Sequence, residues 1–237
     1  MIKALSLLLL LSSPAFATPF GDVQNRATAA NLKPFALDLG GLLGGAAFHS
    51  GHSLGFPGFD IGIVAMTQFT ADRDNAVLRN SAPKGFGLPL VQAEIGLPFR
   101  IDVIGHGISG QGARIFGGGL RWGLIRSGTI VRIPDLSISA FADKVNHTFF
   151  SAEHYSVNAA ASWQLPLLHP FVGFGYDITH AKLGASTIGQ AGASAWARGT
   201  RLTGGLDISP LPFFHIFADY SLRHGQSGAD LGLGVRF

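Results

Sequence analysis

The feature that most constrains this chain is an alternation of apolar residues with polar residues or glycines, which recurs from residue 58 to the end. In the segment YSVNAAASWQ, for instance, Tyr155 and Val157 alternate with Ser156 and Asn158. Because successive side chains of a strand point to opposite faces, this period of two predicts strands with one apolar and one polar face. About ten such segments can be traced, at residues 58–70, 88–96, 100–106, 114–125, 134–143, 155–164, 171–179, 200–209, 213–222 and 230–237.

The distribution of apolar residues indicates which kind of sheet these strands form. Hydrophobic residues make up 47% of the chain and charged residues 13%. Beyond residue 17, however, no apolar run approaches the roughly 20 residues of a membrane-spanning helix. A chain that is apolar on average but never for long is typical of a buried sheet or of a membrane β-barrel. The 33 glycines and 19 phenylalanines favour the barrel.

The connections between the segments alternate in length. Short turns containing proline, such as 97–100, 165–170 and 209–213, alternate with longer polar connections at about 71–86, 106–113, 144–153 and 180–199. Outer-membrane barrels have short periplasmic turns and long outer loops, whereas a soluble sandwich has no reason to sort its loops in this way. The sequence therefore predicts an all-β fold, a transmembrane antiparallel barrel of about ten strands over residues 58–237.

The bilayer-facing aromatic residues of this register fall into two bands, as expected for residues at the two membrane–water interfaces. The outer band contains Phe69, Phe116, Tyr155, Tyr176 and Tyr220. The inner band contains Phe59, Trp122, Trp163, Phe214 and Phe237.

The first 17 residues have the features of a secretory signal peptide. Lys3 gives a positive start, an apolar run follows at 5–11, and Ala15-Phe16-Ala17 forms a small-x-small cleavage site. We therefore expect cleavage before Thr18. The chain contains no cysteine, so a disulfide framework and a lipid-modified N-terminal cysteine are both excluded.

The last residues predict a second targeting signal. Asp230, Gly232, Val235 and the terminal Phe237 resemble the C-terminal signal that the barrel-assembly machinery reads. With stretches such as LPFRIDV, GGGLRWGLI and ASWQLPLLHPFVGFGYD, residues 58–237 resemble an uncharacterised, porin-like family of Gram-negative outer-membrane β-barrels. The resemblance implies a cell outer membrane location, contact with outer-membrane lipid, and handling by periplasmic chaperones and the assembly machinery. It implies no particular solute.

The polar face of the strands would line the lumen. Mixed charge in a lumen can set the selectivity of a channel, but in a barrel of this size the same groups can instead pair across a narrow interior. The predicted lumen-lining residues are Asp60, Glu94, Asp102, Arg121, Asp177, Arg201, Asp207, His215, Asp219 and Arg236.

The segment 18–57 precedes the predicted barrel and is open to three interpretations. Pro34 interrupts its polar first part, and Phe35, Leu39, Leu42 and Ala46 then form one helical stripe. The four glycines among residues 40–45 each cost about 1 kcal/mol in a free helix, so such a helix needs a surface to pack on. A helix plugging the lumen, a periplasmic leader, and an extra strand through 35–39 all remain open.

Histidines raise the question of catalysis or metal binding. His106, His147, His154, His180 and His224 fall in or beside predicted outer loops, where we expect them to be solvated. No catalytic motif accompanies them and their spacing matches no metal site, so we expect no enzyme, cofactor or metal centre. The scattered arginines indicate no nucleic-acid partner. The favoured function is a narrow channel or small-solute transporter; the alternative is a non-conducting barrel that acts through its outer loops.

Overall fold

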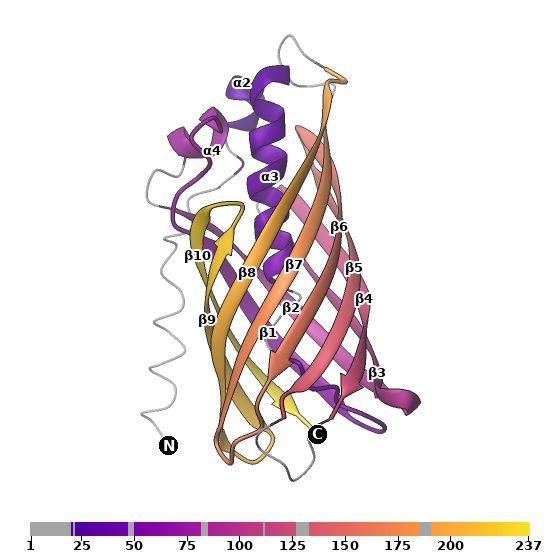
Figure 1. The fold of residues 1–237 in the computed structure, drawn as a ribbon. Coiled ribbons are helices and arrows are strands. Elements are labelled where there is room, and N and C mark those ends of the chain that lie inside the picture. The colour runs from indigo at the N-terminus through magenta and orange to yellow at the C-terminus, as the bar shows by residue number, and fades with distance from the viewer. Residues whose placement is uncertain are drawn as a thin grey trace, which may run out of the picture.

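The computed structural model describes residues 20, 22–46, 50–81, 85–110, 112–126, 133–184 and 191–237. The predicted signal peptide lies outside these residues. Within them, ten strands form a closed barrel (Figure 1). The strands are β1 Phe59–Gln68, β2 Phe86–Leu97, β3 Ile101–Gly110, β4 Ala113–Ile125, β5 Asp135–His147, β6 Phe150–Ser162, β7 Leu168–Leu183, β8 Ser194–Leu211, β9 Phe214–Arg223 and β10 Gln226–Arg236.

Each strand pairs antiparallel with its neighbours in the sequence, and β1 pairs with β10 to close the sheet. This confirms the predicted fold class. One end of the barrel carries the connections β2–β3, β4–β5, β6–β7 and β8–β9 together with Phe237, and we call it the turn end. The opposite end, called the loop end, carries α2 (Val23–Arg26) and α4 (Ala76–Ser81).

Two connections at the loop end are shorter than the sequence predicts. Loops are expected at 106–113 and 144–153, but β3 extends to Gly110 and β4 begins at Ala113, and β5 extends to His147 and β6 begins at Phe150. Their Gly, Ser and Asn residues resemble loop sequences, but the ladder continues through pairs such as Ile108↔Ile115 and Val145↔Ala152. Inward residues of this extension, Ile115 and Val145, are buried in an apolar core, which explains why the strands continue.

The long helix α3, Ala29–Gly45, lies inside the loop-end half of the barrel (Figure 1). It begins with a capping box, in which Thr28 and Asn31 satisfy each other's backbone N–H groups. Pro34 lies within α3 instead of interrupting it. As the sixth residue of α3, Pro34 removes the hydrogen bond that a backbone N–H would donate to the carbonyl of Ala30, and the helix still continues to Gly45. Of the three interpretations of segment 18–57, the lumen helix is therefore the observed one.

The apolar core surrounds α3. The predicted stripe of Phe35, Leu39, Leu42 and Ala46 is 1% exposed at each position. It packs against inward side chains of the wall, among them Met66, Leu90, Ile115, Phe150, Phe171 and Ala181. The lumen is thus not polar throughout: in its loop-end half, the apolar stripe of α3 packs in an apolar core.

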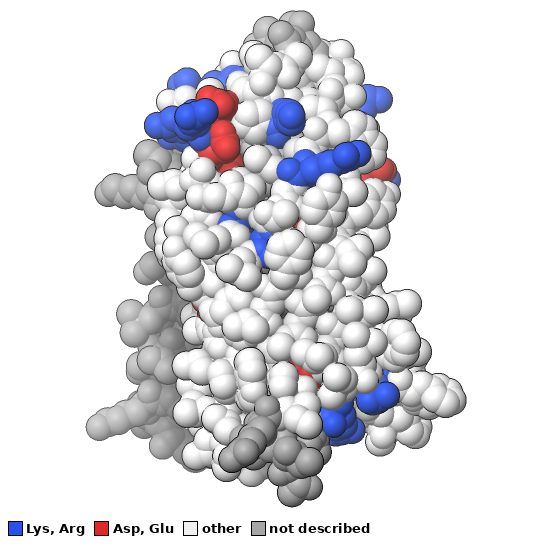
Figure 2. Space-filling view, viewed as in Figure 1, with Lys and Arg blue, Asp and Glu red and all other residues white. Residues whose placement is uncertain are grey.

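The outward face of the wall is apolar. Ile63, Leu120, Val157, Phe174 and Leu231 are between 50% and 63% exposed. Figure 2 shows charged groups near the two ends of the visible face and a largely uncharged band between them. Within the described residues, no helix is both long and apolar enough to cross a membrane.

Candidate functional site

The ten predicted lumen residues all lie on the inward face. Nine of them are buried, and the Arg236 side chain is 28% exposed at the turn end. They do not form one open lining. They divide into two ion-pair clusters at the turn end and one charged wall beside α3.

The first cluster joins β2, β3 and β4. The Arg121 guanidinium donates to Asp102 Oδ2 at 3.0 Å through Nε and to Glu94 through Nη2. Cross-strand register brings them together, because Asp102 pairs directly with Arg121. All three side chains are at most 4% exposed, so removal of the arginine would leave two carboxylates buried without their cation.

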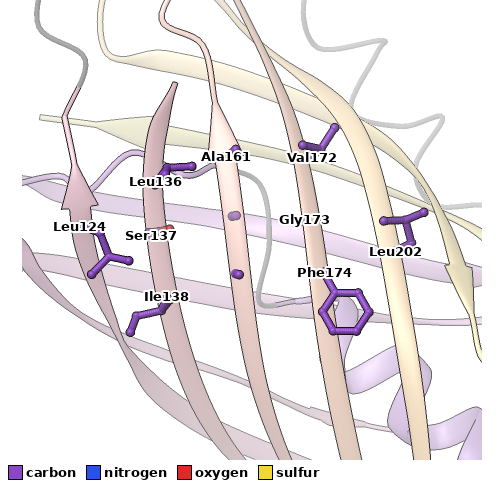
Figure 3. Close-up of a pocket in the computed structure, with 11 residues that line it drawn as sticks. Leu124, Leu136, Ser137, Ile138, Ala161, Val172, Gly173, Phe174 and Leu202 are labelled. Carbon is purple, nitrogen blue, oxygen red and sulfur yellow. The ribbon is translucent and has the colours of Figure 1, made fainter. Parts of the chain in front are cut away.

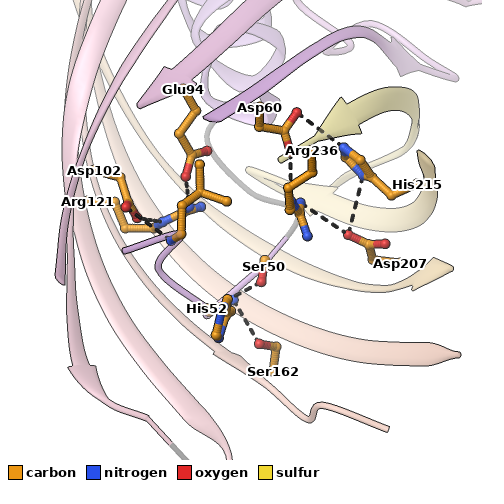
Figure 4. Close-up of polar contacts among 12 residues, drawn as sticks. Ser50, His52, Asp60, Glu94, Asp102, Arg121, Ser162, Asp207, His215 and Arg236 are labelled. Carbon is orange, nitrogen blue, oxygen red and sulfur yellow. Dashed lines mark hydrogen bonds and ion pairs between the residues drawn. The ribbon is translucent and has the colours of Figure 1, made fainter. Parts of the chain in front are cut away.

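The second cluster joins β1, β8, β9 and β10 (Figure 4). His215 lies between two carboxylates, with Nε2 3.0 Å from Asp60 Oδ2 and Nδ1 3.5 Å from Asp207 Oδ2. Arg236 Nε donates to Asp60 Oδ2 at 2.8 Å. Asp219 lies four residues after His215 on the same strand, but the histidine pairs instead with Asp60 and Asp207 from neighbouring strands.

Residues 50–54, which precede β1, lie in the same half of the lumen, where Figure 4 shows Ser50 and His52. His52 Nδ1 lies 2.7 Å from Asp135 Oδ2, and the Leu54 backbone N–H donates to Asp102 Oδ1 at 3.1 Å. Burial lowers the pKa of His52, against the opposing effect of Asp135. This segment ties the N-terminal part of the chain to the wall near the turn end.

The glycines of α3 explain how a helix fits inside the barrel. A Cβ added to Gly44 would lie 2.6 Å from Asp177 Oδ1, and one added to Gly45 would lie 3.0 Å from Asp230 Oδ2 and from Met66 Cγ. Contacts under 3.0 Å are not made by real Cβ atoms. The helix backbone therefore approaches the side chains of Asp177 and Arg201 so closely that a Cβ at residue 44 would displace their charged ends.

The wall that faces these glycines is charged. Arg201 donates from Nη2 to Asn158 Oδ1 at 2.7 Å and lies 3.5 Å from Asp177 Oδ1, and Arg223 pairs with Asp230. Both arginines are 0% exposed. Asp219 is paired in register with Asp230 on the same wall. The glycine face of α3 and these charged side chains together form what we call the plug seat.

Three histidines differ from the prediction. His106 and His154 are buried beside Asp143, with His106 Nε2 2.6 Å from Asp143 Oδ1, and the His224 side chain is only 6% exposed. The expectation that they are solvated is wrong, because their parity in the strands directs His106 and His154 inward. His180 stacks on Trp196 with ring centroids 4.4 Å apart.

Sequence reasoning missed Asp38, the carboxylate that anchors α3. Asp38 is 0% exposed and accepts four hydrogen bonds. The donors are Gln68 Nε2 at 2.6 Å, Asn75 Nδ2 at 2.7 Å, the Asp72 backbone N–H at 2.8 Å and His224 Nε2 at 2.9 Å. The sequence does contain one indication of this role: Asp38 is a single aspartate within an otherwise apolar helical stripe, and a buried carboxylate requires hydrogen-bond partners.

The predicted assembly signal lies on β10 and the residue after it. Asp230 points inward to Arg223, and Gly232 leaves room for the Phe217 ring. Phe237 is 64% exposed at the turn end and stacks on Phe213 with centroids 5.3 Å apart. Val235 pairs with Ile61 at the seam of the barrel.

A cavity of about 10 Å³, lined by Asp60, Glu94, His215 and their neighbours, has room for roughly one water molecule. In the part of the chain that the structure describes, no three His, Cys, Asp or Glu residues are grouped to hold a metal ion.

The fold and the site define a closed antiparallel β-barrel of the outer-membrane type, whose loop-end half encloses the helix α3. No family model and no curated protein matches the chain. Among solved structures, it is similar to the N-terminal β-barrel domain of Pseudomonas aeruginosa OprF (13% identity, 76% of this chain and 97% of that chain, TM-score 0.40). It is also similar to the translocator domain of the autotransporter NalP from Neisseria meningitidis (14%, 89% and 100%, 0.45). A third is the Acinetobacter baumannii outer membrane protein Omp33 (9%, 78% and 100%, 0.34).

Proposed function

We propose that this protein is an outer-membrane channel for small polar solutes, closed at rest by α3 acting as a displaceable plug. The plug seat carries the proposal. In it, a helix with glycines at the contact covers a charged wall formed by Asp177, Arg201, Arg223 and Asp230. Export through residues 1–17, and assembly through the signal that ends at Phe237, would deliver the barrel to the cell outer membrane.

The energetics of the plug seat support a conducting role. Burying ion pairs under a helix is costly, and well-packed apolar residues of similar volume are often at least as stable. A barrel that never opened would gain from an apolar wall at this position, as it has around Leu39 and Leu42. The charged wall is useful if water and solute reach it when α3 moves.

The size of α3 supports the same conclusion. A helix with its side chains occupies a cylinder roughly 10–12 Å across. Displacement of α3 would therefore leave a passage of about that calibre in the loop-end half. The Arg121 and His215 clusters at the turn end would then form the narrow, charged constriction.

Single-channel conductance in planar bilayers tests the proposal on the full mature chain, residues 18–237. Asp38→Asn weakens the hydrogen bonds that hold α3 in place. Asp74→Asn is the matched control, because Asp74 is exposed and lies in the loop that contains the Asp38 partners Asp72 and Asn75. We expect brief openings in the wild type and the control, and a large rise in open probability in Asp38→Asn. An Asp38→Asn protein whose α3 exchanges amide hydrogens rapidly but which never conducts would refute the channel.

A non-conducting barrel is the second candidate, and a specific observation favours it. The two ion-pair clusters and the His52 segment bridge the turn-end half of the lumen independently of the plug seat. On this account α3 serves to order the loop that contains α4, through the bonds from Asp38 to Asp72 and Asn75. It predicts no conductance in any variant of the plug seat.

A further inference from the structure

The outward wall contains an apolar groove of about 330 Å³ in the turn-end half of the barrel (Figure 3). Its floor is formed by Ala159 and Ala161 of β6. One side is formed by Leu136 and Ile138 of β5, and the other by Val172 and Phe174 of β7, with Leu124 and Leu202 at the margins.

The strand register produces this groove. Ala161 pairs with Leu136 on one side and with Val172 on the other, and Ala159 likewise pairs with Ile138 and Phe174. At two successive outward positions, a methyl group therefore lies between two large side chains. Because outward residues recur at every second position along a strand, the two alanines form one continuous groove along β6.

Positive charge lies next to the turn-end margin of the groove. Arg100, in the β2–β3 turn, donates from Nη1 to the carbonyl of Leu124 at 3.2 Å, and Leu124 lines the groove. Arg100 is exposed. Arg126, two residues after Leu124, is exposed as well, but its Nη2 lies 3.5 Å from His52 Nε2, so its guanidinium is directed to the lumen-side segment and not to the groove. The guanidinium of Arg100 has five N–H donors, so this single bond leaves others for a ligand.

The acidic residues near this end do not compete for an anion. Asp60, Glu94, Asp102, Asp135 and Asp207 are all buried, at 0–6% exposure. Among the described residues of the turn end, the exposed charged side chains are therefore arginines. An anionic group held here would meet arginine, which binds phosphate with a planar, bidentate geometry.

We propose that this groove and Arg100 form a binding site for one phospholipid of the membrane. An acyl chain lies along Ala159 and Ala161, and the headgroup phosphate binds Arg100. A phospholipid is the occupant that fits, because the groove is continuous with the apolar outward face and ends where the exposed charge becomes positive. The site lies outside the lumen, so it does not depend on whether the barrel conducts.

Native mass spectrometry of the mature chain with added phosphatidylglycerol tests the site. Ala159→Leu/Ala161→Leu fills the groove at positions that already face lipid. Ala218→Leu, at an outward and exposed position of β9 outside the groove, is the matched control. We expect one tightly retained phospholipid in the wild type and the control, and at least a tenfold loss in the groove variant. Arg100→Gln should lose lipid retention severalfold, while Arg100→Lys should lose less.

A second measurement is made in the membrane and does not require the protein–lipid complex to survive in the gas phase. Trp122 pairs with Ile138, which lines the groove. In a Trp163→Phe/Trp196→Phe background, phosphatidylglycerol with brominated chains should quench Trp122 strongly, and filling the groove should reduce that quenching about twofold or more.

Several results would overturn the site. Equal lipid retention in the groove variant and the wild type would do so, as would equal loss in Ala218→Leu. Glycerol phosphate that displaced the phospholipid would reveal an anion site without an acyl seat. A dimer lost only in the groove variant would assign this face to contact between two copies of the chain.

Discussion

Replacement of Asp38 by asparagine tests the anchor of α3 most sharply. The carboxylate accepts two hydrogen bonds on each oxygen: Gln68 and His224 on Oδ1, and Asp72 and Asn75 on Oδ2. An amide of the same shape has one acceptor oxygen, so two of the four donors lose their partner and face an NH₂ group. At about 1.5–3 kcal/mol for each bond to a charged group, the loss is about 3–6 kcal/mol. Even the lower figure corresponds to roughly a hundredfold change in the docking equilibrium of α3.

Amide hydrogen exchange measures this change locally. We expect the protection of residues 35–45 to fall about a hundredfold in Asp38→Asn, while β4–β6 exchange as in the wild type. Asp74→Asn should change neither region. The reasoning is refuted if α3 keeps its protection, or if α3 and the strands lose protection together, because the helix would then be an inseparable part of the barrel.

Three further substitutions have defined outcomes. Arg121→Ala leaves Glu94 and Asp102 buried without their cation, and should lower the free energy of unfolding by about 3–5 kcal/mol in urea titrations; a loss below 1 kcal/mol would contradict the cluster. In a free helix, Gly44→Ala would raise helix stability by about 1 kcal/mol. Inside the barrel the added methyl group meets the charged side chains of the plug seat, so amide hydrogen exchange in α3 should become faster. Slower exchange would contradict the close approach of Gly44 to the wall. Phe99 has φ 64° and is 86% exposed, so Phe99→Asn should raise stability by about 1 kcal/mol, read from the midpoint of thermal unfolding, and a fall would contradict the strain.

The strands were predictable from the sequence because one physical pattern determines them. A wall with lipid on one side and a filled lumen on the other requires a period of two, and the chain keeps that period through β6, β7 and β10. The inward positions of Glu94, Arg121 and Asp207 follow from the same parity.

The features missed are those set by contacts between distant segments. The strand extensions at Ile115 and Val145 depend on packing against α3, which the local sequence does not reveal. The partners of Asp38 lie 30 to 186 residues away along the chain. The burial of His106 and His154 could have been predicted from the alternation alone, because each histidine lies at a position of its strand that points into the lumen.

The most direct test of the central claim is the conductance of a barrel whose plug can be locked. The chain has no cysteine, so Gly40→Cys/Thr179→Cys introduces the only thiols. The added Cβ at residue 40 lies 3.3 Å from the Thr179 Cβ, close to the roughly 3.5–4.5 Å of a disulfide. We predict that the oxidised protein stays closed and that reduction restores openings in the same membrane. If the oxidised protein, with its cross-link verified, conducts as well as the reduced one, α3 is not the plug.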